Sequence, residues 1–469
     1  MRKNDVIRLQ VTDVNNLGCG VGHLRDAGER EGQTVFVRGG VTGDELEAQI
    51  IKLTKNYLVA RPVRLLSPSP HRIADDCGAA GCGGCAYRSM TYAHELELKR
   101  GYVRNAFRKA GLAEVEVEPV RSDGRVSGYR NKAQYPVARS RDGRTRAGFY
   151  AGASHRLIPA EDCLLQPRLF GEVVRFLCGF ADRHQIPVYD EESGEGLLRH
   201  IYLRMGERSG ELMVCLVLTS ERLPGETELV GELTARFPQL RSLLVNVNPE
   251  RTNVVLGERY RLLAGRAWIE DELCGLRLRI PPQAFYQVNH GGCELLYGLA
   301  KERAGLTGRE LLLDLYCGIG SIGLSMADAA GEVLGMEIVE EAARCAETNA
   351  ARNGISNAAF FCGDASDPQG LLERASRERG DLSGAVVVLD PPRKGATPEL
   401  IDGIAAHGVR RVVYVSCNPD TLARDCARFA SHGYRIGTVT PVDLFPRTGH
   451  VETVVLLSKG EIDSKKVRV

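Results

Sequence analysis

The part of the chain from Leu311 onward alternates short apolar runs with stretches of helical character, and this alternation constrains the fold more than any other feature. The runs lie at residues 311–315, 333–338, 385–389 and 412–416, followed by a closing pair at 434–440 and 451–457. Strands that alternate with helices form a mostly parallel sheet with helices on both faces. We therefore predict a Rossmann-like α/β domain whose binding site lies beyond the carboxyl ends of the strands.

The first of these runs leads into a glycine-rich turn. Asp314 is followed by Leu-Tyr-Cys-Gly-Ile-Gly-Ser-Ile-Gly, so Gly318, Gly320 and Gly323 spell G-x-G-x-x-G. Glycine lets a ligand approach the backbone, but dinucleotide pockets and S-adenosylmethionine pockets both use such a turn. Glu337, at the end of the next run, can accept hydrogen bonds from the ribose of either ligand. Asp314 favours S-adenosylmethionine, because a carboxylate beside the turn repels a pyrophosphate and attracts a sulfonium.

The chain before this domain divides into regions of different character. Residues 1 to about 65 alternate polar and apolar residues in short segments, which predicts a small β-barrel, and Ser-Pro-Ser-Pro at 67–70 marks a linker. Residues 92–110 carry apolar side chains at helical spacing and end at Ala-Gly, which predicts a helix. From 129 to about 280 short alternating segments dominate, which predicts a second, β-rich domain.

Composition excludes several classes of protein. The 469 residues are 43% hydrophobic, which excludes a wholly disordered chain, and 61 Lys and Arg against 60 Asp and Glu leave a net charge of +1. Any nucleic-acid surface must therefore be local. The longest apolar stretch, near 212–218, is far shorter than the roughly 20 residues of a membrane span. We expect a cytoplasmic protein with no membrane partner, in which the 14 cysteines serve metal binding or catalysis rather than disulfides.

Three cysteines gather in a glycine-rich loop, Cys77, Cys82 and Cys85, and Cys163 follows downstream. Four thiolates suit either Zn²⁺ or a [4Fe–4S] cluster. Structural zinc usually has paired C-x-x-C ligands, whereas three close ligands with one remote ligand are common for clusters, so we favour iron–sulfur. The alternative of four unrelated cysteines is weaker, because exposed thiols without a ligand are oxidised readily.

Three chemically active segments lie at the predicted carboxyl edge of the sheet. Cys417 follows one run, Asp390-Pro-Pro-Arg-Lys-Gly follows another, and His450 and Glu452 lie just before the apolar residues 454–457 of the final one. Each has an ordinary structural explanation when taken alone: Cys417 as a packed thiol and Glu452 as a solvent-facing strand residue. Since neighbouring strand ends meet in one crevice, we expect these segments to converge.

These strand ends, together with Pro-Gln-Ala-Phe-Tyr-Gln-Val-Asn at 282–289, resemble the RNA uracil-C5 methyltransferases over nearly the whole chain. That family modifies uridines of ribosomal and transfer RNA, and its ribosomal branch carries a [4Fe–4S] cluster. The resemblance implies a multi-domain fold: an OB-like TRAM β-barrel at 1–62, a central β-rich α+β domain with an iron–sulfur loop at 63–280, a class I methyltransferase domain at 281–461 and a tail at 462–469.

The resemblance also implies residue roles. Cys417 is the expected nucleophile and Glu452 the expected general base. Uracil C5 is a weak nucleophile, so a thiolate must add to C6 before C5 can accept a methyl group, and a base must then remove the C5 proton. The expected contacts to S-adenosylmethionine are Gln287, Tyr316, Glu337 and Asp390, and the expected cluster ligands are Cys77, Cys82, Cys85 and Cys163.

A local basic segment supports an RNA partner. Residues 121–156 hold nine Arg and Lys against two Asp. The interleaved aromatic residues either stack on bases or belong to the core; they are Tyr129, Tyr135, Phe149 and Tyr150. The target uridine must leave its helix to enter the pocket, which is easiest in RNA loops. We expect 23S ribosomal RNA as the target because the cluster cysteines are present, with transfer RNA as the alternative, and no obligate protein partner is evident.

Other classes of function remain open at this point. A non-catalytic RNA-binding or assembly protein is disfavoured by the intact set of Cys417, Glu452 and the glycine turn. An oxidoreductase requires the turn to bind a dinucleotide. An amino-group methyltransferase is disfavoured because Arg393, rather than an aromatic residue, follows Asp390-Pro-Pro.

Overall fold

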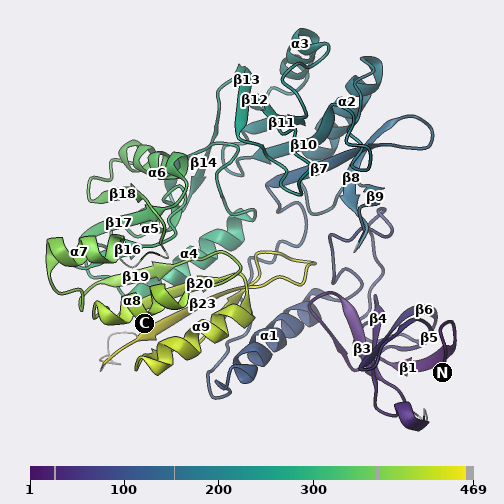
Figure 1. The fold of residues 1–469 in the computed structure, drawn as a ribbon, viewed down its shortest axis with the longest axis horizontal. Coiled ribbons are helices and arrows are strands. Elements are labelled where there is room, and N and C mark those ends of the chain that lie inside the picture. The colour runs from purple at the N-terminus through teal and green to yellow at the C-terminus, as the bar shows by residue number, and fades with distance from the viewer. Residues whose placement is uncertain (26–27, 153, 366, 368–369, 461–469) are drawn as a thin grey trace.

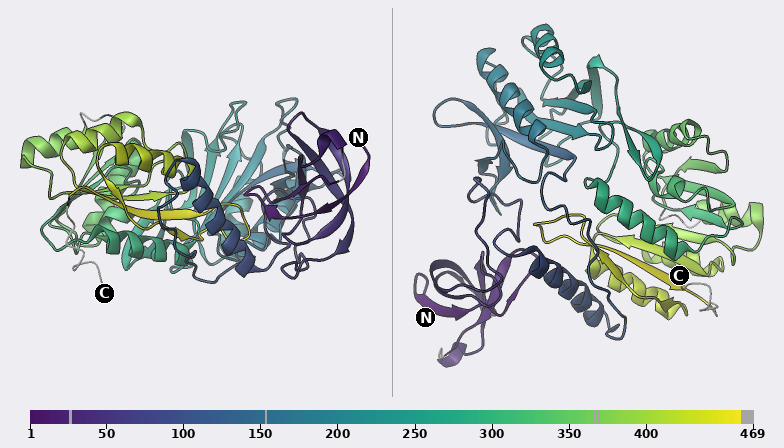
Figure 2. Two further views of the ribbon diagram at one scale, coloured as in Figure 1. Left: turned by 90° about the horizontal axis from the view of Figure 1, so that it is seen from below. Right: turned by 180° about the vertical axis from the view of Figure 1, so that it is seen from behind.

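The computed structural model describes residues 1–25, 28–152, 154–365, 367 and 370–460, so the expected tail at 462–469 lies outside the described residues. Figure 1 shows three sheets arranged around a common centre, in purple, teal and green to yellow along the chain. Helix α1 (Tyr92–Lys109) runs between the first and the last of them and packs against α9 (Pro419–Ser431) (Figure 2). None of the described helices is long and apolar enough to cross a membrane.

The N-terminal region forms a six-stranded sheet in the order β1-β5-β6-β4-β3-β2, and its β structure is confirmed. Alternate residues of its strands are buried, as β5 shows with Leu46, Ala48 and Ile50, and these side chains make a separate small core. A 3₁₀ helix occupies Gly28–Arg30. The strands are β1 (Val6–Gln10), β2 (Asp13–Val14), β3 (Cys19–His23), β4 (Thr34–Arg38), β5 (Glu45–Leu53) and β6 (Tyr57–Ser67).

The middle region forms a seven-stranded sheet in the order β13-β12-β11-β10-β7-β8-β9. Two helices that the sequence analysis did not name, α2 (Arg168–Arg183) and α3 (Glu226–Arg236), pack on one face and enclose a core with the sheet. The other face packs against the hairpin of β14 (Ile269–Leu273) and β15 (Leu276–Ile280). The strands are β7 (Lys132–Arg139), β8 (Thr145–Tyr150), β9 (Leu157–Pro159), β10 (Leu198–Met205), β11 (Leu212–Leu218), β12 (Leu240–Val247) and β13 (Arg259–Gly265).

The C-terminal region is an eight-stranded sheet in the order β18-β17-β16-β19-β20-β23-β21, with β22 paired to β23. The first five strands of this order are parallel and β23 is antiparallel to β20, so the predicted α/β domain is confirmed. The strands are β16 (Leu311–Asp314), β17 (Glu332–Glu337), β18 (Ala358–Cys362), β19 (Val386–Leu389), β20 (Arg411–Ser416), β21 (Arg435–Ile436), β22 (Thr440–Val442) and β23 (Glu452–Ser458).

One detail of this sheet differs from the prediction. The run at 434–440 is two short strands rather than one, because the chain leaves the sheet between them. There the Val439 N–H donates to the Glu116 carbonyl, and Val439 forms an isolated bridge with Val117. The segment before β22 is therefore tied to the connection that follows α1.

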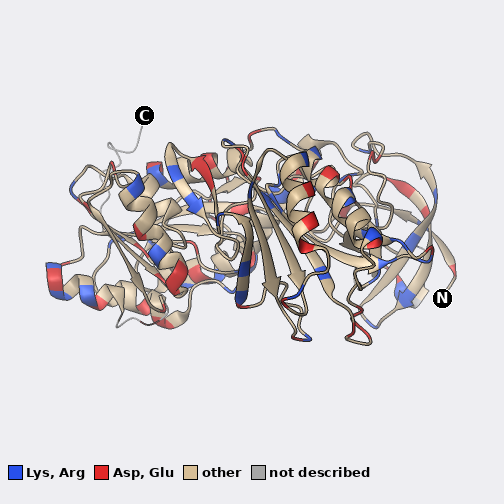
Figure 3. Cartoon of the chain, turned by 90° about the horizontal axis from the view of Figure 1, so that it is seen from above, with Lys and Arg blue, Asp and Glu red and all other residues tan. Residues whose placement is uncertain are grey.

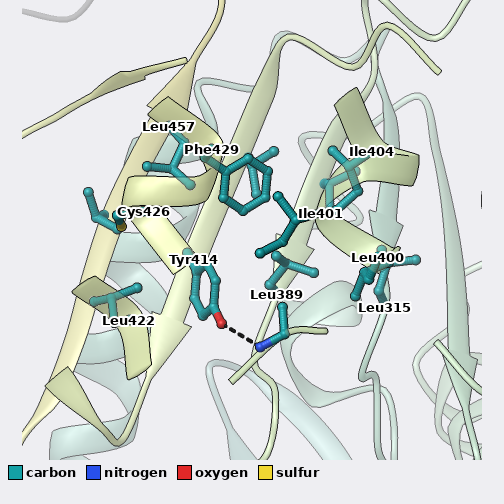
Figure 4. Close-up of a cluster of buried hydrophobic side chains, with 14 of the residues drawn as sticks. Leu315, Leu389, Leu400, Ile401, Ile404, Tyr414, Leu422, Cys426, Phe429 and Leu457 are labelled. Atoms are coloured by element: carbon teal, nitrogen blue, oxygen red, sulfur yellow. Dashed lines mark hydrogen bonds between the residues drawn. The ribbon is translucent and has the colours of Figure 1, made fainter. Parts of the chain in front are cut away.

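Helices cover both faces of the C-terminal sheet. One face packs against α1, α7, α8 and α9, and the other against α4, α5 and α6. Figure 4 shows the first face, where the Tyr414 ring lies among Leu389, Leu422 and Phe429, and its hydroxyl accepts a hydrogen bond from the Ala396 N–H. The segment after β19 is thereby fixed over the sheet. The helices are α4 (His290–Ala304), α5 (Ser321–Ser325), α6 (Glu340–Arg352), α7 (Leu371–Arg379) and α8 (Pro398–Ala406).

Candidate active site

Three chemically active side chains lie at the ends of three adjacent strands of the C-terminal sheet. Asp390 follows β19, Cys417 follows β20 and Glu452 begins β23. β19 pairs with β20, and β20 pairs with β23 in a register that sets Ser416 opposite Thr453. One step further along this register Cys417 and Glu452 lie opposite each other. The convergence expected from the strand ends is therefore present at the edge where such sheets bind ligands.

Glu452 is a buried carboxyl with little to balance its charge. The residue is 3% exposed, and among the described residues no hydrogen bond or ion pair reaches its carboxylate. Burial, and then the neighbouring Asp390 charge, raise the pKa of Glu452 well above its usual value, while Arg393 acts in the opposite direction. A carboxylate with a raised pKa is a stronger base, which suits it to remove a proton from carbon.

The Cys417 thiol shares this environment. Burial, followed by the charges of Glu452 and Asp390, raises the pKa of Cys417 to about 11, and Arg393 opposes the shift. Asn418, the N-cap of α9, donates from Nδ2 to the Arg393 carbonyl at 3.1 Å, which joins the ends of β19 and β20. The thiol is protonated near pH 7, so it becomes a nucleophile only when a proton leaves the site.

The glycine turn forms the neighbouring part of the edge, between β16 and the short helix α5. The Gly318 N–H donates to Glu337 Oε2 at 3.0 Å and the Val339 N–H to Glu337 Oε1 at 2.9 Å, so Glu337 ties the turn to the end of β17. Its oxygens keep lone pairs for a hydroxyl donor. Asp314 is fully buried beneath the turn and accepts from the Gly323 N–H at 3.0 Å. Asp314 can therefore act on a ligand through its charge but not through direct contact.

The two aspartates of this edge are both easily protonated. Burial raises the pKa of Asp314 to about 7. Burial, and then the Asp314 charge, raise the pKa of Asp390 to about 7. Because like charges disfavour ionisation and an added cation favours it, the edge is prepared for a positively charged ligand.

The remaining predicted contacts to the methyl donor lie in two places. Tyr316 follows β16, its ring packs against the core on the side of α1 and α9, and burial, followed by the Asp364 charge, raises its pKa to about 12. Gln287 is buried in the segment before α4, and its backbone carbonyl accepts from Asn131 Nδ2 at 3.0 Å. Gln287 is thus held against the edge of the middle sheet rather than at a strand end of the C-terminal sheet.

A cavity of about 520 Å³ is lined by residues of all three regions, and Asp390, Cys417 and Glu452 are not among its lining residues. Arg393, Phe445 and His450 line it from the C-terminal region, Arg38 from the N-terminal sheet and Phe149 from the middle sheet. Burial, and then the Arg393 charge, lower the pKa of His450 to about 4, so this ring is neutral near pH 7. Aromatic rings and cations around one cavity suit a nucleotide.

The four predicted cluster cysteines line this same cavity: Cys77, Cys82, Cys85 and Cys163. All four are free thiols, and burial, followed by the Cys163 charge, raises the pKa of Cys85 to about 12. In the described ranges, no three His, Cys, Asp or Glu side chains are arranged so that they could hold a metal ion. The structure brings the predicted ligands together around one cavity, but it does not show a closed iron–sulfur site as expected.

The basic segment at 121–156 is partly neutralised within the fold. Arg125 pairs with Glu207, and Arg139 with Asp182 at 2.6 Å. Figure 3 shows Lys and Arg interspersed with Asp and Glu along the ribbon, in keeping with the net charge. Within the described residues no ion pair engages the exposed Arg121, Arg141 and Arg156, or Arg130, which is half-buried and lines the cavity. A smaller basic surface than expected is left for RNA.

The aromatic residues of that segment divide into two groups. Tyr129 and Tyr135 are fully buried, and the Tyr129 hydroxyl donates to the Pro446 carbonyl at 2.9 Å, so neither can stack on a base. Phe149 lines the cavity and Tyr150 is half-buried. Stacking on RNA is therefore restricted to the second group.

Sequence reasoning missed a buried charged group behind the cavity. Lys99 of α1 forms ion pairs with Glu95 at 2.8 Å and with Asp443 at 2.7 Å, and all three side chains are fully buried. The sequence of α1 could have indicated this group, because the buried face of the helix contains Glu95 and Lys99 as well as Val103 and Phe107. Two opposite charges four residues apart on a buried face predict a partner from elsewhere in the chain.

Comparisons with known families identify two parts of the chain. Residues 268–460 match the tRNA (Uracil-5-)-methyltransferase family, and residues 2–63 match the TRAM domain. Proteins described as uncharacterized RNA methyltransferases are similar over nearly their whole length. The one from Bacillus cereus is 38% identical over 98% of both chains, and the one from Clostridium tetani is 36% identical over 98% of this chain and 97% of its own.

A solved structure has a similar fold. The crystal structure of Pyrococcus abyssi tRNA (uracil-54, C5)-methyltransferase in complex with S-adenosyl-L-homocysteine matches with a TM-score of 0.76 and 26% sequence identity. The match covers 96% of this chain and 100% of the other, so all three regions have counterparts in one arrangement.

Proposed function

Because the chain belongs to the RNA (uracil-5-)-methyltransferase family, with a TRAM domain at its N-terminus, we propose that it forms 5-methyluridine in 23S ribosomal RNA. It is an S-adenosylmethionine-dependent RNA (uracil-5-)-methyltransferase. This excludes the oxidoreductase and the non-catalytic RNA-binding protein. The observation that carries the residue roles proposed below is the convergence of Asp390, Cys417 and Glu452 on one edge.

We assign the chemistry to this edge as follows. S-adenosylmethionine supplies a methyl group on a cationic sulfur. The Cys417 thiol first loses its proton to solvent. The thiolate then adds to C6 of the flipped uracil, and the C5=C6 electrons move to C5, which becomes the nucleophile. After C5 has gained the methyl group, Glu452 removes the C5 proton. The C5–H electrons re-form the double bond, and the C6–S bond breaks with its electrons returning to sulfur.

The donor pocket in this proposal consists of Gln287, Tyr316, Glu337 and Asp390. Glu337 orients the ribose through its free lone pairs, and Asp390 with the buried Asp314 supplies negative charge toward the sulfonium. Tyr316 follows β16, the strand that lies between β17 and β19 in the sheet.

Donor affinity should increase with pH. Since Asp314 and Asp390 have pKa values near 7, they carry more negative charge at pH 8 than at pH 6. A cation binds the ionised form more tightly, so we expect the Kd for S-adenosylmethionine to fall about tenfold over this range. Calorimetry measures it, and S-adenosylhomocysteine, which lacks the sulfonium charge, is the matched control ligand. Equal pH dependence for both ligands, or no change in Asp390→Asn, contradicts this electrostatic role.

We also propose that the four cysteines around the cavity hold a [4Fe–4S] cluster. The chemistry of the donor set supports this, because four thiols line one cavity and four thiolates are the ligand set of a [4Fe–4S] cluster. Mutual repulsion among the thiolates is offset when a cationic cluster binds. Iron and acid-labile sulfide in anaerobically purified protein, at about four of each per chain, test the assignment, and Cys85→Ser should lower both. Zinc at one per chain contradicts it.

The target RNA is the finer part of the proposal. The four cysteines favour 23S ribosomal RNA through the resemblance to the ribosomal branch, whereas the similarity to the Pyrococcus abyssi enzyme favours transfer RNA as a second candidate. Purified protein, labelled S-adenosylmethionine and unmodified 23S RNA or transfer RNA from a strain lacking the gene distinguish them. Label in 5-methyluridine of 23S RNA is the expected result, and label in transfer RNA alone reverses the assignment.

This assignment also implies which function each region has. We propose that residues 1–62 and the middle region, 63–280, bind the RNA, and that 281–461 carries out the transfer. All three regions line one cavity, so they lie close enough together to contact one RNA, which supports this proposal.

A further inference from the structure

The buried ion pairs of Lys99 connect α1 to the segment that carries the proposed base. Lys99 Nζ contacts Glu95 Oε1 at 2.8 Å and Asp443 Oδ1 at 2.7 Å, and it also donates to the Phe445 carbonyl at 3.1 Å. Lys99, Glu95 and Asp443 have no exposed side-chain surface. Lys99 therefore joins two parts of the chain that lie more than 300 residues apart in sequence.

The partner of Lys99 lies at the base of the hairpin that presents Glu452. Val442, the last residue of β22, pairs with Glu452, the first residue of β23. Asp443 follows Val442 directly and begins the hairpin loop, residues 443–451, which returns to Glu452. Phe445 and His450 of this loop line the cavity. A contact that fixes the position of Asp443 therefore also fixes the start of β23, from which Glu452 projects.

The same loop is held at a second point, close to the cysteines. The Arg447 carbonyl accepts from the Ala86 N–H at 2.9 Å and the Tyr87 N–H at 3.1 Å, and the Arg447 N–H donates to Glu95 Oε1 at 2.7 Å. Arg447 has φ of 69°, an uncommon value for a residue with a side chain. Glu95 Oε1 thus accepts hydrogen bonds from both Lys99 Nζ and the Arg447 N–H, so the loop conformation depends on α1.

Stability alone does not explain why the charged side chains of Glu95, Lys99 and Asp443 are buried at this position. Replacing a buried ion-pair group by apolar side chains of similar volume is often neutral or stabilising, so stability gives little reason to bury them. Charge-assisted hydrogen bonds have defined lengths and directions, whereas apolar contacts do not. The group supplies a fixed position for the loop, which is what a general base requires.

We propose, on the basis of the function proposed above, that Lys99 with Glu95 and Asp443 is a positioning group that fixes Glu452 for the elimination step. When the group is intact, Glu452 reaches the C5 proton of the methylated adduct. The proton passes to the carboxylate, the C5–H electrons form C5=C6, and the Cys417 sulfur leaves C6 with its bonding electrons. Addition of Cys417 and methyl transfer depend on β16, β19 and β20, which this group does not touch.

The test separates the two halves of the reaction. The variant Glu95→Gln/Lys99→Met/Asp443→Asn removes the charges of all three residues and takes from Arg447 its contact with Glu95 at 3.5 Å. Asp443→Asn alone, which keeps Glu95 as a partner for Lys99 and Arg447, is a milder second variant. Both are compared with wild type in single turnovers at saturating substrate RNA containing ordinary uridine. We expect methyl transfer to RNA to remain within about threefold, while release of methylated RNA from the covalent adduct slows about a hundredfold. The adduct should then accumulate on denaturing gels.

A matched control distinguishes positioning from lost stability. Ile404→Ala creates a cavity under α8, where Ile404 is fully buried away from the hairpin, and it should destabilise the protein without accumulation of adduct. If the triple variant slows methyl transfer and release equally, or releases product as wild type does, the positioning role is wrong. A failure of the proposed function is recognised separately, because wild type would then form no adduct even with 5-fluorouridine RNA.

Discussion

We expect Cys417→Ala to lower turnover on the order of 10⁴-fold or more and to abolish the covalent complex with 5-fluorouridine RNA. The sulfur at the end of β20 is the atom assigned to C6, and without it C5 has no source of the electrons needed to attack a methyl group. Fluorine at C5 cannot be removed as a proton, so the wild-type adduct is trapped after methyl transfer. Denaturing electrophoresis with labelled S-adenosylmethionine detects this adduct.

The control for this experiment is a thiol of the same region that does not face the crevice. Cys426 lies on α9 and is fully buried, so Cys426→Ala should retain the trapped complex. A labelled adduct that persists in Cys417→Ala would transfer the nucleophile role to another residue. An adduct that forms without S-adenosylmethionine and carries no label would show addition uncoupled from methylation.

The C-terminal sheet and its active edge were predictable because burial dictates both. Strands covered on both faces must be apolar throughout, as Val386–Leu389 is, so each such run is visible in the sequence and its end is defined by the first polar residue. Asp390, Cys417 and Glu452 stand at those ends. Parallel connections bring the carboxyl ends of β19 and β20 to one side of the sheet, and the antiparallel strand β23 begins at that same side, which places Glu452 beside them.

Features that depend on contacts between distant segments were not predictable in this way. Lys99 and Asp443 lie 344 residues apart, and neither sequence neighbourhood identifies the other. The partners of Arg125 and Arg139, Glu207 and Asp182, come from other elements, so the sequence overstated the free positive charge of the basic segment. A charge count in one segment omits neutralisation that only the folded chain supplies.

The grouping of residues around the central cavity was not predictable from the sequence for the same reason. Its walls come from the N-terminal sheet, the cysteine loop, the middle sheet and the hairpin loop at 443–451. Each of these lining segments is short, and its sequence has no periodic hydrophobic pattern. The sequence indicated which residues are chemically active, but the packing of three separate cores determines that the four cysteines and Arg393 share one space.

We expect Glu452→Gln to lower turnover by about 10²- to 10⁴-fold while leaving methyl transfer nearly intact. Glutamine has almost the same shape as glutamate, but its amide does not accept a proton from carbon. The methylated uracil should then stay bound through C6 to Cys417 even in RNA with ordinary uridine. A stoichiometric labelled adduct, formed in one turnover and stable on a denaturing gel, is the expected measurement.

The pH dependence of adduct release in wild type tests the same role independently. Burial and the Asp390 charge raise the pKa of Glu452, so its basic form becomes more abundant as the pH increases. Release should therefore accelerate with pH in wild type, whereas the slow release in Glu452→Gln should not follow that profile, because no carboxyl titrates there. Asp390→Asn removes the repelling charge and should shift the wild-type profile toward lower pH. If Glu452→Gln releases product at the wild-type rate, the proton leaves C5 by another route, and His450, which is neutral and lies two residues before Glu452, is the next residue to replace.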